Sequence, residues 1–441
     1  MSGMHLSKEF FEVLKAIGES KSKQEEDRIM QKEIATLKQK METPTAPART
    51  AAGAVENYLA SAKKRANEFL VRLLYVEMLG FDASFGYIKA LELAASSSAS
   101  LKKTGYLLCS ACLSPQHEFR FMLVNQMQRD LSSSSVVDNC AALIAVTNLI
   151  TNDMVPAMVN DVTKLIDHAS DSVRKKAIIA LHRFHQLAPE VVTRGDICDK
   201  LRKVLCDKDP AVMGASLNCI ESMARVDAKP FKDLVPSLVS ILKQILESRL
   251  PADYEYHRVP APWMQMKIVR ILSILGKGDA NASNGMYEIL NNCIRKADGS
   301  INAGNAVIHE CVRTITAIYP NPTLLDSAAE AISRFISSKS ANLRYLGITG
   351  LAEIVESHPQ YAATHQMAVI ECLEDRDETL KRRTLDLLYK MTNAVNVQFI
   401  TEKMLQFLRT TMDSFLKKSL TAKVCSLAER YAPNNIWYVT C

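Results

Sequence analysis

The sequence has few of the features that mark β-sheet and membrane-spanning proteins. Only 6% of its 441 residues are aromatic, and it holds just 15 glycines and 15 prolines. Because 48% of the residues are hydrophobic and alternating β-branched stretches are scarce, helix-forming residues dominate and predict an all-α protein. No stretch reaches the roughly 18 consecutive apolar residues that a membrane-spanning helix needs. We therefore expect that any membrane contact is made by docking.

Targeting signals and a strong net charge are also missing. Residues 1–5 contain no signal-peptide core, Ser2 stands where myristoylation requires glycine, and Cys441 lacks the three residues that follow a prenylated cysteine. Lys and Arg outnumber Asp and Glu by 54 to 48, a net charge of +6, which does not indicate nucleic acid as a partner. The 11 cysteines lie mostly on apolar helical faces, typical of reduced thiols in a cytosolic protein.

No residue spacing predicts a catalytic, metal or cofactor site. Cys109 and Cys112 form the only close cysteine pair, and no second pair or nearby histidine completes a zinc site. His182 and His185, on the exposed side of a predicted helix, are three residues apart, whereas zincins need a spacing of four. The segment 276–279 lacks the spacing of a phosphate-binding loop and is interpreted as a helix end. We expect no enzyme activity, a structural cysteine pair, and histidines that form surface or inter-repeat hydrogen bonds.

The sequence is instead organised as a repeat. In the segment 171–189, N-capping residues precede apolar residues at three- and four-residue steps, and Pro189 follows the last turn, which predicts an amphipathic helix. Similar patterns open at Leu101, Val136, Val212, Leu343 and Leu380. Neighbouring copies are roughly 35 to 39 residues apart, the period of HEAT and armadillo hairpins. The predicted fold is a right-handed α-solenoid of such hairpins.

Three segments are expected along the chain. Residues 1–42 are predicted to form one long amphipathic helix, and 43–57 a flexible linker of small residues and prolines. Residues 58–441 form the solenoid, whose apolar C-terminal end lacks the polar cap that such folds usually have, so we expect it to be truncated. Within it, 249–263 holds three prolines and several aromatics, which predicts an ordered, extended connector.

One basic cluster is the best candidate for a membrane or phosphoinositide contact. Lys63, Lys64 and Arg65 begin the first solenoid helix, directly after the linker. Each cation near an anionic leaflet contributes around 1 kcal/mol. The alternative interpretation is an ordinary solvated helix face.

Five stretches resemble the adaptin family, the large subunits of vesicle-coat adaptor complexes. Residues 70–87, 173–177 and 205–213 resemble the start of the adaptin trunk. Residues 256–263 and 365–373 resemble one particular type of large subunit within that family. The similarity extends from about residue 8 to the C-terminus, with an interruption at the linker, and is more specific than any single motif.

The resemblance implies an adaptin trunk without hinge or ear, acting as a non-enzymatic subunit of a heterotetrameric complex. Such complexes sort transmembrane cargo in vesicle-mediated transport from the trans-Golgi network to endosomes. The implied partners are a small sigma-type and a medium mu-type subunit, a second, beta-type large subunit, an Arf-type GTPase and, indirectly, cargo sorting signals. The implied location is cytoplasmic and peripheral on Golgi membranes and coated vesicles.

Two alternatives remain from the residues themselves. The first is a general HEAT or armadillo scaffold, or a transport receptor that binds cargo peptides directly. The second, more distant, is a GTPase-activating protein that supplies an arginine finger.

Overall fold

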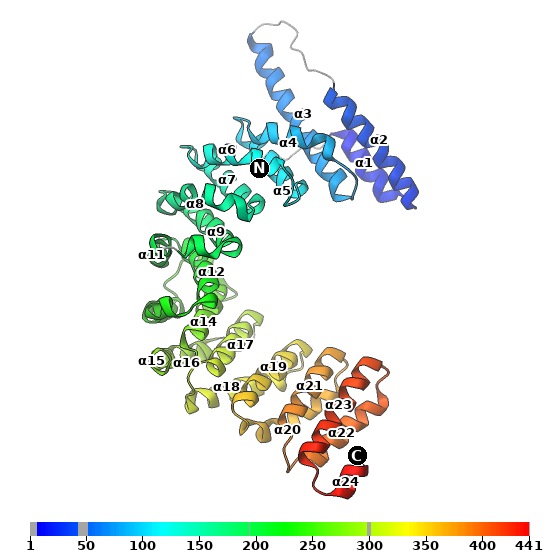
Figure 1. Ribbon diagram of the computed structural model, residues 1–441, viewed down its shortest axis with the longest axis vertical. Helices are drawn as coiled ribbons and strands as arrows, with labels where there is room; N and C mark the ends of the chain where they lie inside the picture. Colours follow the sequence, from blue (N-terminus) through cyan, green and yellow to red (C-terminus); the bar gives the residue numbers. More distant parts are fainter. Residues whose placement is uncertain (1–6, 43–51, 194, 298–300, 441) are drawn as a thin grey trace. The chain divides into compact units, whose positions relative to one another are not determined.

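The structure, a computed structural model, describes residues 7–42, 52–193, 195–297 and 301–440. Nearly all regular structure in these ranges is α-helix (Figure 1), which confirms the predicted all-α solenoid class. None of the described helices is both long and apolar enough to cross a bilayer. The chain divides into two compact units, Met1–Ser222 and Met223–Cys441.

In the first unit, helices alternate between two layers, and most successive helices within a layer pack side by side. Layer A consists of α3 (Ala52–Met78), α5 (Ala99–Cys112), α7 (Val136–Leu149), α9 (Asp171–Leu187) and α12 (Pro210–Val226), the last of which runs past the end of the unit. Layer B consists of α4 (Tyr87–Ala94), α6 (Phe119–Leu131), α8 (Val155–Lys164) and α11 (Gly195–Lys203). Short connecting helices are η1 (Ser84–Gly86), η2 (Asn152–Met154), η3 (Leu165–Asp167), α10 (Pro189–Val192) and η4 (Val204–Cys206).

The second unit has the same alternation. Its layer A consists of α14 (Pro262–Gly276), α17 (Asn302–Ala317), α19 (Ala341–Ser357), α21 (Glu378–Met391) and α23 (Ser414–Tyr431). Its layer B consists of α13 (Val235–Leu246), α16 (Tyr287–Lys296), α18 (Pro322–Ile336), α20 (Tyr361–Glu371) and α22 (Val397–Thr410). Short helices are η5 (Lys229–Leu234), η6 (Ala252–Tyr254), α15 (Ala280–Asn284), η7 (Cys372–Glu374) and α24 (Asn435–Thr440).

The core of each repeat is the apolar stripe that the sequence predicts. In α9, Val173, Ala177, Leu181 and Phe184 are fully buried, as expected for residues on one helical face. A recurring ion pair then ties several repeats to the next. Both oxygens of Asp207 accept hydrogen bonds from Arg174, each at 2.8 Å, and this pairing lowers the pKa of Asp207. The pairs Arg344–Asp375 and Arg382–Asp413 repeat the arrangement in the second unit.

The N-terminal segment differs from the sequence prediction. Instead of one long helix there are two, α1 (Lys8–Glu19) and α2 (Lys23–Glu42), so the single-helix prediction is wrong. Two serines explain the break: Ser20 Oγ donates to the carbonyl of Ile17 at 2.7 Å, and Ser22 Oγ accepts from the amide of Glu25, competing with helix continuation. Of the predicted linker, 43–51 lies outside the described residues, and 52–57 belong to α3.

A buried arginine connects both N-terminal helices to α3. Arg72 Nε and Nη2 donate to the two carboxylate oxygens of Glu33 on α2, at 2.6 and 2.8 Å. Its Nη1 reaches Glu9 on α1 and Glu68 on α3, both at 3.3 Å. The side chains of Arg72 and Glu33 are only 3% and 4% exposed. Burial by itself lowers the pKa of Arg72, but the hydrogen bonds to Glu33 outweigh it and the pKa lies above its usual value.

The connector predicted at residues 249–263 is ordered, and it folds into a small hairpin. Strands β1 (Glu255–Tyr256) and β2 (Val259–Pro260) pair antiparallel, with Tyr256 opposite Val259. Tyr256 also packs edge-on against the ring of Trp263, with 5.0 Å between ring centroids. Positive φ angles, rare for residues with a side chain, occur among the described non-glycine residues at Ser248, His257, Arg258 and Ala261. Since three of these residues lie within 249–263, the connector contains a strained turn.

Candidate functional site

Layer A of the first unit exposes three large apolar side chains at equivalent positions of successive helices. Leu107 on α5, Ile144 on α7 and Ile179 on α9 are 58%, 49% and 42% exposed. Each follows a buried glycine or alanine by two positions, which turns it away from the packed core. The three helices are neighbours, since α5 contacts α7 and α7 contacts α9, and we call these three exposed residues the apolar stripe.

The apolar stripe has a defined end. The equivalent position on α12 is held by Asn218, which is exposed and donates to the carbonyl of Gly214 at 3.1 Å. Single exposed apolar residues are ordinary, but a contiguous apolar patch on a folded protein typically marks an interaction surface. The stripe is therefore the best candidate for a protein-binding face in the first unit.

Layer A of the second unit carries charges instead. The residues of this charged ladder are Arg270 on α14, Glu310 and Arg313 on α17, Glu353 and Glu356 on α19, Asp386 and Lys390 on α21, and Lys423 on α23. Arg270 donates to both carboxylate oxygens of Glu310, at 2.9 and 2.7 Å. Burial raises the pKa of Glu353, against the opposing effect of Arg313. A cavity of about 390 Å³ is lined by both signs of charge from α14, α17 and α19.

Sequence reasoning missed the apolar stripe and the charged ladder. Each is built from positions about one repeat apart, so no local motif marks them. Aligning the repeats and comparing their exposed positions would have found Leu107, Ile144 and Ile179, which are separated by 37 and 35 residues in the numbering.

The predicted membrane site is only partly described. Lys63, Lys64 and Arg65 all lie in α3, but the side chains of Lys63 and Lys64 lie outside what the structure describes. Arg65 is exposed. Their contact with lipid stays a prediction.

The cysteine pair is buried and protonated. Cys109 is buried and Cys112 half-buried, both as free thiols, and burial raises the pKa of each thiol to about 12. A thiol with so high a pKa stays protonated at neutral pH and is therefore a poor nucleophile. Within the described ranges, no group of three or more His, Cys, Asp or Glu side chains could hold a metal ion.

The histidines and the glycine-rich segment have structural roles. The expectation that His185 lies on an exposed face is wrong, because its side chain is only 3% exposed. Its Nδ1 shares a 3.0 Å hydrogen bond with Ser222 Oγ on α12, which confirms the inter-repeat bond. Helix α14 ends at Gly276, and Gly278 has a φ of +68°, which confirms the helix end.

The buried His185 should make stability depend on pH. Burial lowers its pKa from the usual value near 6.5, so below that pH the unfolded chain takes up a proton that the folded chain resists. Stability is thus expected to fall between pH 7 and pH 5, by at most about 1.4 kcal/mol per pH unit from this group. His185→Gln should flatten this slope in thermal melts while changing the slope above pH 7 little. An identical slope in the variant would contradict the assignment.

The described residues thus form a two-layer helical repeat that carries the apolar stripe in one unit and the charged ladder in the other. The chain matches the model of the Adaptin N terminal region over residues 26–441, and it belongs to that family. This confirms the resemblance that residues 70–87 indicate, and with it the absence of enzyme activity, because proteins of this family are coat and adaptor components.

The similar proteins are large subunits of adaptor complexes. The chain is 44% identical over 437 residues to the AP-4 complex subunit epsilon of Arabidopsis thaliana, covering 99% of the chain and 45% of that relative. It is 40% identical over 418 residues to the AP-4 complex subunit epsilon-1 of Homo sapiens, covering 95% of the chain and 35% of that relative. The stretch 256–263 indicates the same epsilon type. The chain thus spans less than half the length of these relatives.

Two known structures have a fold similar to that of this chain. A homology model of the full-length AP-3 complex in an intermediate open conformation matches with a TM-score of 0.58 at 20% identity, covering 82% of the chain and 64% of that chain. An engineered protein matches with a TM-score of 0.52 at 13% identity, covering 97% of the chain and all of that protein. At such low identity, these likenesses show the helical fold alone.

Proposed function

We propose that this chain is the N-terminal trunk of the large subunit of a heterotetrameric vesicle-coat adaptor complex. The complex sorts transmembrane cargo from the trans-Golgi network to endosomes. Two findings support this: the 44% identity to an epsilon subunit over nearly the whole chain, and layer-A faces suited to holding partners. The observation that carries the proposal is the apolar stripe, because a scaffold subunit needs an exposed surface that its partners bury.

In this proposal, the apolar stripe binds the small sigma-type subunit. Burying Leu107, Ile144 and Ile179 would contribute about 25 cal/mol per Å² of apolar area removed from water. The mu-type subunit, the beta-type large subunit and an Arf-type GTPase bind other surfaces. The complex lies on the cytoplasmic side of Golgi membranes and coated vesicles as a peripheral component. Lys63, Lys64 and Arg65 contribute to membrane docking through attraction to anionic lipid.

The test is co-expression of the chain with an epsilon-matched sigma subunit, followed by mass determination of the purified species by light scattering. A one-to-one complex is expected. Ile144→Asp should weaken it by about 2 kcal/mol or more, roughly thirtyfold, because it places a charge at the centre of the buried surface. Adding Leu107→Asp should abolish it.

Met367→Asp is the matched control, because Met367 on layer-B helix α20 is 60% exposed and far from the stripe in sequence. This variant should bind like wild type, and all variants should keep the wild-type circular dichroism. If a folded chain does not bind the sigma subunit, the result would favour the alternative function, a general scaffold or a transport receptor. If the stripe variants bind unchanged, another surface holds the small subunit.

A further inference from the structure

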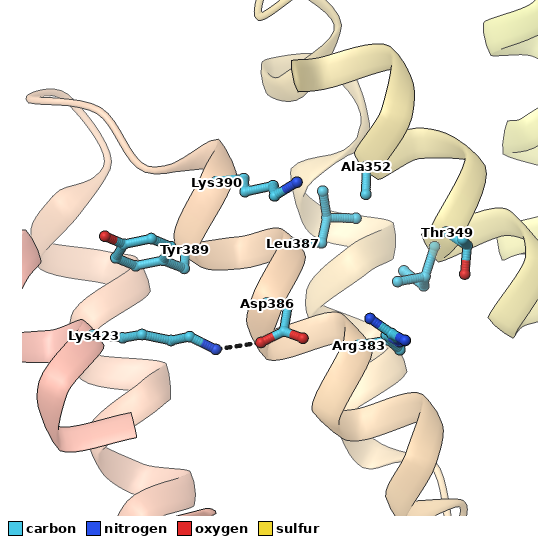
Figure 2. A pocket seen from close by; sticks show the side chains of 9 residues that line it. Thr349, Ala352, Arg383, Asp386, Leu387, Tyr389, Lys390 and Lys423 are labelled. Atoms are coloured by element: carbon cyan, nitrogen blue, oxygen red, sulfur yellow. Dashed lines mark hydrogen bonds and ion pairs between the residues drawn. The ribbon is translucent and has the colours of Figure 1, made fainter. Parts of the chain in front are cut away.

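A small recess interrupts the charged ladder between α19, α21 and α23. It has a volume of about 240 Å³. Figure 2 shows its side chains: Arg383, Asp386 and Lys390 come from α21, and Lys423 reaches in from α23. Between Arg383 and Lys390, Leu387 lies near Ala352 of α19 and gives the recess an apolar floor. We call it the basic recess.

The charges in the basic recess do not balance. Three of its lining residues are cations and one is an anion, and one of the cations pairs with a carboxylate next to the recess, which leaves one positive charge in excess. Lys423 pairs with Asp386 across the recess, as the dashed line in Figure 2 marks. Lys390 Nζ lies 2.6 Å from an oxygen of Glu356, but Glu356 is outside the recess. Arg383 is exposed and makes no hydrogen bond or ion pair with any described residue.

This imbalance distinguishes the recess from the ladder beside it. On α14 and α17, Arg270 is matched by Glu310, and Arg313 by Glu353 on α19. There the charges of the ladder are paired with one another. In the basic recess, the guanidinium of Arg383 keeps all of its donors available, in a planar fork that suits a carboxylate.

The shape and the apolar lining of the basic recess determine which kind of anion it can bind. A membrane surface binds cations that project outward, whereas these cations line a recess together with the apolar side chains of Leu387 and Ala352. Such a lining suits a ligand that carries an apolar group next to its negative charge. Arg383 and Lys390 are seven residues apart, hence about 10 Å along the helix. An extended peptide covers that distance in about three residues.

We propose that the basic recess binds an extended acidic peptide segment of a partner protein. One carboxylate of the peptide binds Arg383 and a second, about three residues away, binds Lys390. An apolar side chain between them packs on Leu387 and Ala352. The proposal goes beyond the assembly role above, and it does not depend on which subunits bind the apolar stripe in the other unit.

The probe for the test is a fluorescein-labelled peptide with two glutamates three positions apart and leucines between them, titrated with the full 441-residue chain in fluorescence anisotropy at low salt. Arg383→Gln and Lys390→Gln should each weaken binding about tenfold, and the double variant about a hundredfold, because each removes one charge-assisted hydrogen bond. A glutamine analogue of the peptide should bind the wild type as weakly as the acidic peptide binds the double variant.

Two control variants separate the recess from general electrostatics. Arg376→Gln removes the same charge at an exposed site just before α21 that does not line the recess, and it should bind the peptide like wild type. Arg383→Lys keeps the charge without the fork and should lie between wild type and Arg383→Gln. Both substitutions are at exposed positions, so thermal melts should match the wild type.

Three outcomes would overturn the proposal. The first is equal peptide affinity in wild type and double variant, and the second is equal affinity for the acidic and glutamine peptides. The third is a loss, in the double variant, of flotation with phosphatidylcholine–phosphatidylserine vesicles while peptide binding stays at the wild-type level, which would assign the cations to lipid headgroups. The peptide experiment contains no other subunit, so its outcome does not depend on the outcome of the sigma-subunit test.

Discussion

Replacing Arg72 by methionine should weaken the attachment of α1 and α2 to α3 by about 3–5 kcal/mol, because Glu33 would remain buried without its cation. Glu33 is 4% exposed and receives two of the four hydrogen bonds that Arg72 makes. Glu9 is 63% exposed, so water can replace the arginine there. The cost therefore concentrates on the Glu33 carboxylate.

Hydrogen exchange measured by mass spectrometry reports this directly. In Arg72→Met, the amides of α1 and α2 should exchange much faster, while the protection of α9 should stay as in wild type. The double variant Arg72→Met with Glu33→Met should recover much of the lost protection, because it removes the unpaired charge together with its partner. Arg28→Met, at an exposed position of α2, is the matched control and should change protection little.

A result in which the double variant is as unprotected as Arg72→Met would contradict this account. It would show that the packing of the arginine side chain, rather than the unpaired carboxylate, holds the N-terminal helices in place.

The parts of the fold that the sequence predicts are those fixed by local periodicity. Val173, Ala177 and Phe184 recur at helical steps, and each repeat has its own copy of this signal. The sequence does not predict the break between α1 and α2, because residues 23–28 are polar and mostly charged residues compatible with a helix, and the turn signals Ser20 and Ser22 are weak. The bond between Arg72 and Glu33 joins residues 39 apart in sequence, beyond the range of a local pattern.

The same distinction applies to the candidate surfaces. Lys63, Lys64 and Arg65 attract attention because they are consecutive, although nothing in the described structure assigns them a ligand. The apolar stripe forms only when three successive repeats pack with equivalent positions side by side. The charge of the basic recess depends on which carboxylate each cation pairs with. Lys390 pairs with Glu356 and Lys423 with Asp386, so Arg383 remains unpaired among the described residues. Such pairings follow from the packing of neighbouring helices, not from any one of them.

Replacing Arg120 on α6 should also cause a large loss of stability. Arg120 is a buried cation that is hydrogen-bonded to carbonyl groups rather than to a carboxylate. Its side chain is 6% exposed, and burial lowers its pKa. Nε and Nη2 donate to the carbonyl of Leu113, which follows α5, and Nη1 donates to that of Leu149, the last residue of α7, at 2.7 Å. Both carbonyls belong to helix C-terminal ends, which carry partial negative charge.

Arg120→Met should therefore destabilise the first unit by about 2–4 kcal/mol, since two buried carbonyls lose their donors at about 1–3 kcal/mol each and the relief of a buried charge returns part of this. Arg120→Lys keeps the charge, but one ammonium group cannot take the place of a fork that spans two helix ends. In urea denaturation, the decrease in the free energy of unfolding caused by Arg120→Lys should be within about 1 kcal/mol of the decrease caused by Arg120→Met. Arg129→Met, exposed on the same helix, should cost less than about 0.5 kcal/mol. A lysine variant as stable as wild type would show that positive charge at the helix ends suffices and that the shape of the guanidinium does not matter.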